Sequence, residues 1–213
     1  MVQIAPRGIR AEKTRGTILE AAEELFAERG FDATRLEDIA ERVGIRRASI
    51  VYYFKDKREL YEAVLASVFG GLYDVLAEVL GRPDPLPDRI EAGVLAWVDY
   101  VGSRPTLARF ILREVADATT ERGPAVRSHA DSFAELIRKE VFERPDFADV
   151  KLADIDPVHL ASIVSGSTVF FVAAMPTLLP GGSFDPTHAD QLATLKDELL
   201  HIVRRLAGTR DLL

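Results

Sequence analysis

Residues Ile18 to Leu60 read ILEAAEELFAERGFDATRLEDIAERVGIRRASIVYYFKDKREL, and this stretch decides the fold. Its apolar residues recur every three or four positions, which is the period of an α-helix. Gly30 stands where a glycine commonly ends a helix, so a first helix should stop there. Two short helices then fit 36–43 and 47–53, on either side of Gly44.

Two short helices joined by a tight turn are the parts of a helix-turn-helix, whose second helix presents polar side chains to the major groove of DNA. Gly44 can adopt the positive φ that the turn needs. The seam between the two helices is predicted from the apolar positions Leu36, Ile39, Ala40, Val43, Ile45 and Ile50. The residues left to face outward are Arg46, Arg47, Ser49, Val51 and Tyr52, with Tyr53 and Lys57 near the groove wall.

The whole stretch resembles the DNA-binding domain of the TetR (tetracycline-repressor-like) family. The landmarks that carry the resemblance are LFAERGF, TRLEDIA, GI, YYF and KREL, in that order. The resemblance implies a homodimeric transcriptional regulator, with an N-terminal domain that binds double-stranded DNA and a larger helical domain that binds a small molecule. Beyond residue 60, the chain shares with the family only its typical length and number of helices.

The resemblance also implies roles for individual residues. Thr34, Tyr53 and Lys57 would contact phosphates and so set the register on the duplex. Arginine suits bidentate contact with guanine, so Arg47 is the favoured base contact. The groove-facing set is Arg46, Arg47, Ser49 and Tyr52. The full predicted DNA-binding set is Thr34, Arg35, Arg46, Arg47, Ser49, Val51, Tyr52, Tyr53 and Lys57.

Three positions depart from the family pattern. Arg46 stands where the family often has a small hydroxyl residue, and Ala48 where it often has glycine. Val51 replaces a frequent tyrosine, so it either meets a thymine methyl group or removes a phosphate contact. The operator sequence therefore cannot be borrowed from a relative.

The charge distribution fits a DNA-binding N-terminus in an acidic protein. The net charge is −7, which by itself argues against a polyanionic partner. Residues 1–57 carry 11 Lys/Arg and 10 Asp/Glu, whereas 58–213 carry 16 and 24. Two basic clusters are candidate phosphate contacts, namely Arg7, Arg10, Lys13 and Arg15, and then Arg46, Arg47, Lys55 and Lys57.

The helical period continues to the end of the chain, and the fold class expected is all-α with about nine helices. Asp56 and Glu59 form a capping-box pattern ahead of a long amphipathic helix, and the proline-rich stretch 81–87 is expected to be a loop. Further helices are expected at roughly 88–102, 105–115, 124–143, 157–175 and 188–207. The domains predicted are 1–57, with the helix-turn-helix, and 58–213, for ligand binding and dimerisation.

The helices at 157–175 and 188–207 resemble the family's dimerisation pair. The first is rich in alanine, serine and glycine, which let helix backbones approach closely. A two-fold dimer implies a palindromic operator. The alternative is that both are ordinary core helices of a monomer.

The family places an effector cavity among the helices of the larger domain. The candidate lining residues are Trp97, Leu107, Phe110, Arg113, Phe133, Phe170, Phe171 and Met175. Such residues also form plain cores. The expected effector is a small hydrophobic or amphipathic molecule, and no cofactor is implied.

Several other classes of protein find little support. The chain has no cysteine, no Gly-x-Ser-x-Gly elbow, no phosphate-binding glycine loop and no His-Glu-x-x-His pair. A metal or catalytic site at Asp154, Asp156 and His159 is less favoured than a helix cap, so no enzyme activity and no metal site are expected. No run of about 20 uninterrupted apolar residues is present, and the longest candidate lies around Val169–Met175. The chain is expected in the cytoplasm without a membrane partner.

Two alternatives stay open at this point. In the first, the protein is a helical fold that sequesters a small molecule or docks on a partner without using DNA. In the second, it binds DNA without sensing a ligand. Repression is the family's usual mode of regulation.

Overall fold

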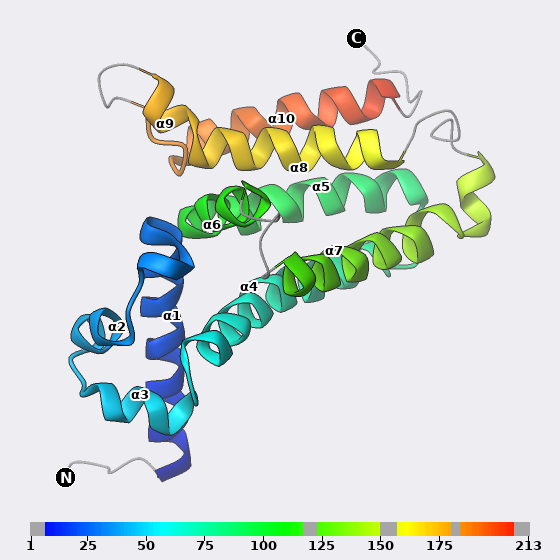
Figure 1. Ribbon diagram of the computed structural model, residues 1–213. Helices are drawn as coiled ribbons and strands as arrows, with labels where there is room; N and C mark the ends of the chain where they lie inside the picture. Colours follow the sequence, from blue (N-terminus) through cyan, green and yellow to red (C-terminus); the bar gives the residue numbers. More distant parts are fainter. Residues whose placement is uncertain (1–6, 117–122, 150–156, 180–183, 207–213) are drawn as a thin grey trace, which may run out of the picture. The chain divides into compact units, whose positions relative to one another are not determined.

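The computed structural model describes residues 7–116, 123–149, 157–179 and 184–206 (Figure 1). In these ranges the chain is all-α, as expected, and contains no strand. They hold ten α-helices, a π-helical segment at Arg138–Phe142 and a 3₁₀-helix at Pro145–Asp149. The number of helices therefore exceeds the nine or so expected, in part because the four-residue α9 (Met175–Leu178) follows α8 (Pro157–Ala173).

The chain divides into two compact units, Met1–Val68 and Phe69–Leu213. This division falls inside α4 (Lys57–Leu80), whereas the sequence placed the domain boundary before that helix, at 57–58. The first turns of α4 belong to the first unit because their apolar side chains fill its core. For example, the ring of Tyr61 lies edge-on to that of Phe26, with centroids 5.1 Å apart.

The first helix, α1 (Arg7–Ala33), is broken where the sequence expected it to end. Gly30 has φ 78° and ψ 172°, a conformation outside the helical region that residues with a side chain rarely adopt. The helical residues after it form a last short turn that leads into α2 (Leu36–Val43). The inward face of α1 is formed by Ile18, Ala22, Leu25 and Phe26, each at most 1% exposed.

The predicted turn between α2 and α3 (Arg47–Tyr53) is confirmed. Gly44 has φ 73° and ψ 31°, the left-handed conformation of a helix C-cap. Its N–H donates to the carbonyl of Glu41 at 3.1 Å, and the N–H of Ile45 donates to that of Ala40 at 2.9 Å. These bonds satisfy carbonyls at the end of α2 and turn the chain sharply toward α3.

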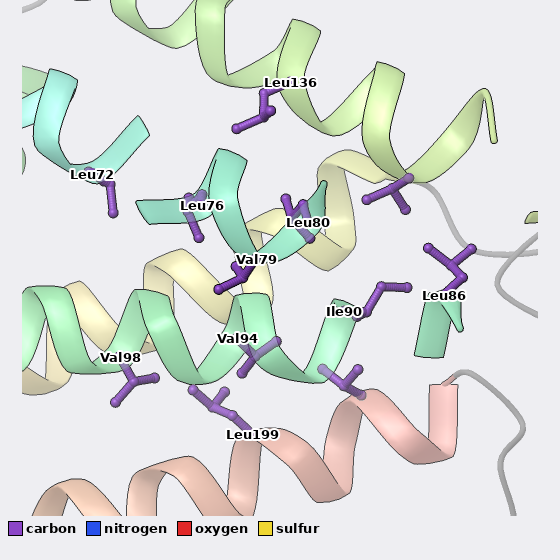
Figure 2. Close-up of a cluster of buried hydrophobic side chains, with 12 residues drawn as sticks. Leu72, Leu76, Val79, Leu80, Leu86, Ile90, Val94, Val98, Leu136 and Leu199 are labelled. Atoms are coloured by element: carbon purple, nitrogen blue, oxygen red, sulfur yellow. The ribbon is translucent and has the colours of Figure 1, made fainter. Parts of the chain in front are cut away.

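The core of the second unit is formed mainly by α4, α5 (Leu86–Gly102) and α10 (Ala189–Leu206), with contributions from α7 (Gly123–Ile137). Figure 2 shows Leu76 and Val79 of α4 above Val94 of α5, and Leu199 of α10 below it. The helix α6 (Pro105–Ala116) buries Leu107 and Phe110 completely.

Most helices of this unit lie close to their expected positions, but the one expected at 124–143 becomes π-helical after Ile137, and α5 begins earlier than expected. This helix begins at Leu86, so the last two residues of the expected loop 81–87 are helical. Pro87 stands in the first turn, where a missing N–H costs nothing because it would have no helical partner.

Close contact and ion pairs hold α10 against α5. A Cβ on Gly102 would lie 2.7 Å from Cδ2 of Leu192, so only glycine fits there without a shift of that side chain. Arg204 donates from Nε and Nη2 to the two carboxylate oxygens of Glu91, at 2.8 and 2.7 Å. This bidentate geometry fixes the rotation of α10 as well as its distance.

Arg89 of α5 is a buried hub that the sequence analysis did not single out. Its side chain is fully buried. Nη1 donates to the carbonyls of Leu80 (2.7 Å) and Glu140 (2.9 Å), and Nε donates to that of Asp84 (3.0 Å). Nη2 donates to Oδ2 of Asp146 at 3.0 Å. One guanidinium thus joins the end of α4, the loop after it, the π-helical segment and the 3₁₀-helix.

The helix α4 is long and apolar enough, by length and composition, to cross a membrane. Charged residues interrupt its sequence, so it did not stand out as an apolar run. Its buried side chains belong to the cores of the two units, with Leu60 and Val64 in the first and Leu72 and Leu76 in the second. A core helix accounts for this composition.

Candidate nucleic-acid interface

The helix α3 is anchored by one face and exposed on the rest. Ile50 is fully buried and Phe54, just after the helix, is 1% exposed. Tyr52 is 81% exposed and Val51 is 44% exposed, which is unusual for apolar and aromatic side chains of this size. Arg46 and Arg47 are also exposed, at the beginning of the helix. Four residues of the expected outward set, Arg46, Arg47, Val51 and Tyr52, are therefore exposed, whereas Ser49 is partly buried.

Acidic side chains of α1 and α2 are matched by arginines of the same unit. Arg42 donates to Glu24 at 2.7 Å, and Arg29 donates to Asp38 at 3.3 Å. Arg46, by contrast, makes no ion pair within the part of the chain that the structure describes. The charge of Arg46 is thus not neutralised by a described side chain, unlike that of Arg42.

Arg47 forms an ion pair that a base contact would have to break. Its Nε lies 3.0 Å from Oε1 of Glu37, and the two side chains are 61% and 58% exposed. An exposed pair of this kind contributes at most about 1 kcal/mol, so the guanidinium can leave it for a stronger acceptor.

Thr34 does not lie where a phosphate contact through its side chain would require. It is fully buried, and its hydroxyl lies 2.7 Å from the carbonyl oxygen of Gly30 and 3.1 Å from that of Leu25. The expectation from the family pattern fails for this side chain, because the break at Gly30 leaves carbonyls that the hydroxyl satisfies. Arg35, next to it, is exposed, and its backbone N–H donates to Asp38 at 3.3 Å.

Lys57 is also turned inward. Its Nζ donates to the carbonyls of Phe31 (2.7 Å) and Thr34 (3.0 Å) and lies 4.3 Å from the centroid of the Phe31 ring. Tyr53, the remaining expected phosphate contact, is half-buried, and its ring lies edge-on to that of Tyr52 with centroids 5.1 Å apart.

The beginning of α4 is capped as the sequence predicts, with one variation. The backbone N–H of Glu59 donates to Oδ1 of Asp56 at 2.9 Å. The Glu59 carboxylate accepts in return from the N–H of Lys55 at 2.8 Å, one residue earlier than in the usual capping box. This reciprocal pair fixes the connection between α3 and α4.

The first basic cluster, formed by Arg7, Arg10, Lys13 and Arg15, lies within the range of α1. Residues 1–6 lie outside the described part of the chain, as do the side chains of Arg7 and Arg10, whereas α1 begins at Arg7. Lys13 is exposed on this helix. Arg15 places its guanidinium 5.0 Å from the centroid of the Phe54 ring, so it is held near the end of α3.

The candidate effector residues all lie in the second unit, but one of them faces outward. Leu107 and Phe110 are fully buried, and Phe171 packs edge-on against Phe184 with centroids 5.1 Å apart. Phe170 is 48% exposed, so the structure does not place it in the interior with the other candidates. The partly buried candidates are Trp97, Arg113, Phe133 and Met175.

An aromatic cluster joins α4 to α7 in the second unit. His129 stacks on Phe69 with centroids 5.1 Å apart, and Phe133 contacts both Phe69 (6.3 Å) and Tyr73 (6.0 Å). Burial lowers the pKa of His129 below its ordinary value, so the ring is neutral at pH 7. Phe69 and Tyr73 were missed from the sequence, although their spacing of four places them on one face of the helix.

No group of three or more metal-ligating side chains occurs among the residues that the structure describes. Asp154 and Asp156 of the considered cluster lie outside the described residues. His159, the third member, is exposed on α8.

Residues 18–64 match the family model described as bacterial regulatory proteins, tetR family. The chain is 30% identical over 132 residues to the HTH-type transcriptional activator FasR of Mycolicibacterium smegmatis, and 34% identical over 126 residues to the HTH-type transcriptional regulator TtgR of Pseudomonas putida. These matches cover 62% and 59% of this chain, and only 58% and 54% of the two relatives. The chain therefore spans little more than half the length of these relatives.

A longer match is to the HTH-type transcriptional regulator RutR of Escherichia coli, at 26% identity over 91% of this chain and 84% of RutR. Two solved structures share the fold. They are FadR of Bacillus subtilis in complex with stearoyl-CoA, with TM-score 0.70 and 16% identity, and KstR2 of Mycobacterium tuberculosis, with TM-score 0.67 and 20% identity. They cover 92% and 97% of this chain, and 99% and 96% of their own lengths. These relatives are transcriptional regulators and not enzymes.

Proposed function

We propose that the chain is a transcriptional regulator of the tetR family, whose model matches residues 18–64, and that it reads double-stranded DNA through α3. The observation that carries this proposal is the exposure of α3. A single apolar residue, Ile50, anchors the helix, while Tyr52 stands 81% exposed beside the two arginines at its beginning. A helix held in this way offers side chains of mixed chemistry to a groove.

The residues of α3 divide by the chemistry that they offer. Arg46 and Arg47 are assigned to base edges, because guanidinium groups pair with the two acceptors of guanine. Ser49 and Tyr52 supply hydroxyl groups, and Val51 offers methyl groups to thymine. Tyr53 and Arg35, at the margins of this surface, are assigned to phosphates.

We propose further that the protein is a homodimer through α8 and α10. The helix α8 contains no Asp, Glu, Lys or Arg and is largely apolar, yet Phe170 is 48% exposed on it. Ile202 is 39% exposed on α10. Helices of this composition are normally buried on all sides, so a second copy of the chain is the natural cover.

Gly166 supports the same interface. It lies in the middle of α8, where glycine costs about 1 kcal/mol relative to alanine, and an added Cβ would meet nothing within 4 Å. Nothing among the described residues therefore requires glycine at this position, whereas close approach of a partner helix would. A two-fold dimer would read a palindromic operator.

The effector is proposed to be a small hydrophobic or amphipathic molecule that binds inside the second unit. The protein is proposed to be a repressor, and binding of the effector is proposed to release it from DNA. Aromatic side chains dominate the candidate region, and His129 there is neutral. The indole N–H of Trp97 is buried and has no acceptor among the described residues, so it can donate to a ligand oxygen. The likeness in fold to a regulator solved with stearoyl-CoA is compatible with an amphipathic ligand. The proposed location is the cytoplasm.

The test of DNA binding is in vitro selection from a randomised duplex library. The purified protein is compared with an Arg46→Ala/Arg47→Ala variant at two salt concentrations. Enrichment of a palindrome by the parent and not by the variant, with affinity that falls steeply as salt rises, would support the proposal. If no sequence is enriched even at low salt, the protein is better regarded as a binder of small molecules alone.

A promoter that carries the selected sequence then decides between repression and activation. Transcription from it is measured in vitro with and without the protein. Repression is expected, and an increase in transcript would overturn that part of the proposal. The comparison matters because FasR, which is similar to this chain, is named as an activator.

A further inference from the structure

Lys57 and Lys55 carry the same charge on either side of Asp56, but the structure uses them differently. The Lys57 ammonium is directed toward carbonyl oxygens, at 2.7 Å from Phe31 and 3.0 Å from Thr34, with Asp32 at 3.4 Å. The Lys55 side chain is exposed and makes no ion pair or hydrogen bond within the described residues.

The carbonyls around the end of α1 need donors because the helix is broken there. Gly30 departs from helical geometry, so residues near it lose the regular partner four positions along the chain. Thr34 donates its hydroxyl hydrogen to the carbonyl of Gly30 at 2.7 Å and lies 3.1 Å from that of Leu25, and Lys57 supplies its ammonium to the carbonyls of Phe31 and Thr34. The two side chains together satisfy the link between α1 and α2.

A phosphate contact by Lys57 would undo this arrangement. An ammonium has three hydrogen atoms, and at least two are used by carbonyls at short distance. The contact with the face of the Phe31 ring adds a favourable cation–π interaction. If Lys57 left these partners, backbone carbonyls in a partly buried position would lose their donors, which costs free energy. A phosphate contact by Lys55 would carry no such cost, because its side chain has no partner among the described residues.

We propose that Lys57 is a positioning residue that fixes the α1–α2 link to the first turn of α4, and that Lys55 supplies the phosphate contact at this corner. The inference rests on the proposed DNA binding and refines it. It separates two lysines of the same basic cluster by role. Because α2 leads directly into the turn at Gly44, a fixed α1–α2 link also fixes the orientation of α3.

The test compares Lys55→Met with Lys57→Met, since both variants lose one positive charge and keep an apolar stem. Affinity for the selected duplex, or for a random duplex at low salt if none is selected, is measured across a salt series. The temperature is one at which near-UV circular dichroism shows both variants folded. The slope of log affinity against log salt should decrease by about 1 in Lys55→Met, as expected for one lost phosphate contact.

Lys57→Met should keep the parent slope and lose affinity several-fold at every salt concentration. Amide hydrogen exchange should be faster at residues 31–36 in Lys57→Met and unchanged in Lys55→Met. A slope reduced in Lys57→Met and unchanged in Lys55→Met would overturn the inference and leave the DNA-binding proposal intact. If the parent binds no duplex at any salt, the DNA-binding proposal fails, whereas the exchange result still decides whether Lys57 holds the link.

Discussion

Replacing Arg89 by methionine should destabilise the protein strongly. The substitution keeps most of the apolar stem and removes the donors to the carbonyls of Leu80, Glu140 and Asp84. A hydrogen bond to a charged group contributes roughly 1.5 to 3 kcal/mol when buried, and less when part of it is open to water. Only the bond to Leu80 is wholly buried, so the three bonds together should contribute about 3 to 4 kcal/mol.

The ion pair of Arg89 with Asp146 should contribute much less than the carbonyl bonds. The Asp146 side chain is 40% exposed and its Oδ1 lies 3.9 Å from Nε of Arg144, so the carboxylate keeps a second cation nearby when Arg89 is lost. Asp146→Asn should therefore cost no more than about 1 kcal/mol. Arg82→Met is a matched control, because Arg82 makes only an exposed pair with Glu78 at 3.4 Å. It should change the free energy of unfolding by less than about 0.5 kcal/mol.

The assay is urea unfolding followed by far-UV circular dichroism, with thermal unfolding in parallel. All variants are measured at one protein concentration, because the midpoint of a dimer depends on it. Arg89→Met should lower the melting temperature by roughly 10 °C in a chain of this size. Equal stability of Arg89→Met and Arg82→Met would refute the assignment of the hub. A larger loss in Asp146→Asn than in Arg89→Met would show that the ion pair dominates instead.

Three further predictions concern the second unit. Gly166→Leu should convert the proposed dimer to a monomer in size-exclusion chromatography with light scattering. Gly166→Ala adds only a Cβ with no described atom within 4 Å, so this variant should fold normally. A dimer that survives Gly166→Leu would exclude this face. Gly70→Ala should raise the free energy of unfolding by about 0.5 to 1 kcal/mol, because no described atom lies within 4 Å of the added Cβ. Gly71→Ala should not raise it, because its Cβ would lie 2.6 Å from the Tyr100 hydroxyl. Urea unfolding measures both variants, and a higher stability of Gly71→Ala than of Gly70→Ala would contradict this prediction. Because burial lowers the pKa of His129, the folded state binds its proton less well than the unfolded state, so His129 should favour folding fully above its ordinary pKa of about 6.5 and progressively less as the pH falls below it. The fall in unfolding free energy between pH 7 and 5 should be smaller in His129→Gln than in the parent, and an identical pH profile would show that the ring is solvated.

The sequence predicted the helices well because their apolar period is strong and their ends carry clear signals. Gly44 was expected to take a positive φ, and it does. Asp56 and Glu59 were expected to cap α4, and both carboxylates accept backbone N–H groups there. Such local patterns depend on a few neighbouring residues, so they can be identified without knowledge of the fold.

The direction of single side chains was harder to predict. Thr34 and Lys57 look like exposed polar residues in the sequence, and only the path of the chain after Gly30 brings their donors to backbone carbonyls. Phe170 and Phe171 are neighbours on a helix that is apolar all round, so its periodicity cannot show which of them faces inward. Tertiary contacts decide both cases.

Arg89 carried a signal that could have been used. It follows Leu86 by three positions and precedes Gly93 by four, so it lies on the buried stripe of α5. A charged residue at such a position requires buried partners. Its partners could not be named from the sequence, because Glu140 and Asp146 are more than fifty residues away in the chain.

The division of the chain inside α4 limits how the first unit, which carries the proposed DNA-reading helix, can be excised or exchanged. A cut after residue 57 follows the domain boundary predicted from the sequence. Such a cut would remove Leu60, Tyr61, Val64 and Leu65, which are each at most 2% exposed. The fragment would keep the whole of α3 but would lose the first turns of α4, whose apolar side chains fill the core of the first unit. A fusion of the first unit to another protein domain must therefore include the chain through Val68. The helix must also continue in phase across the junction, because each residue added or removed there would rotate the attached domain by about 100° around the helix axis.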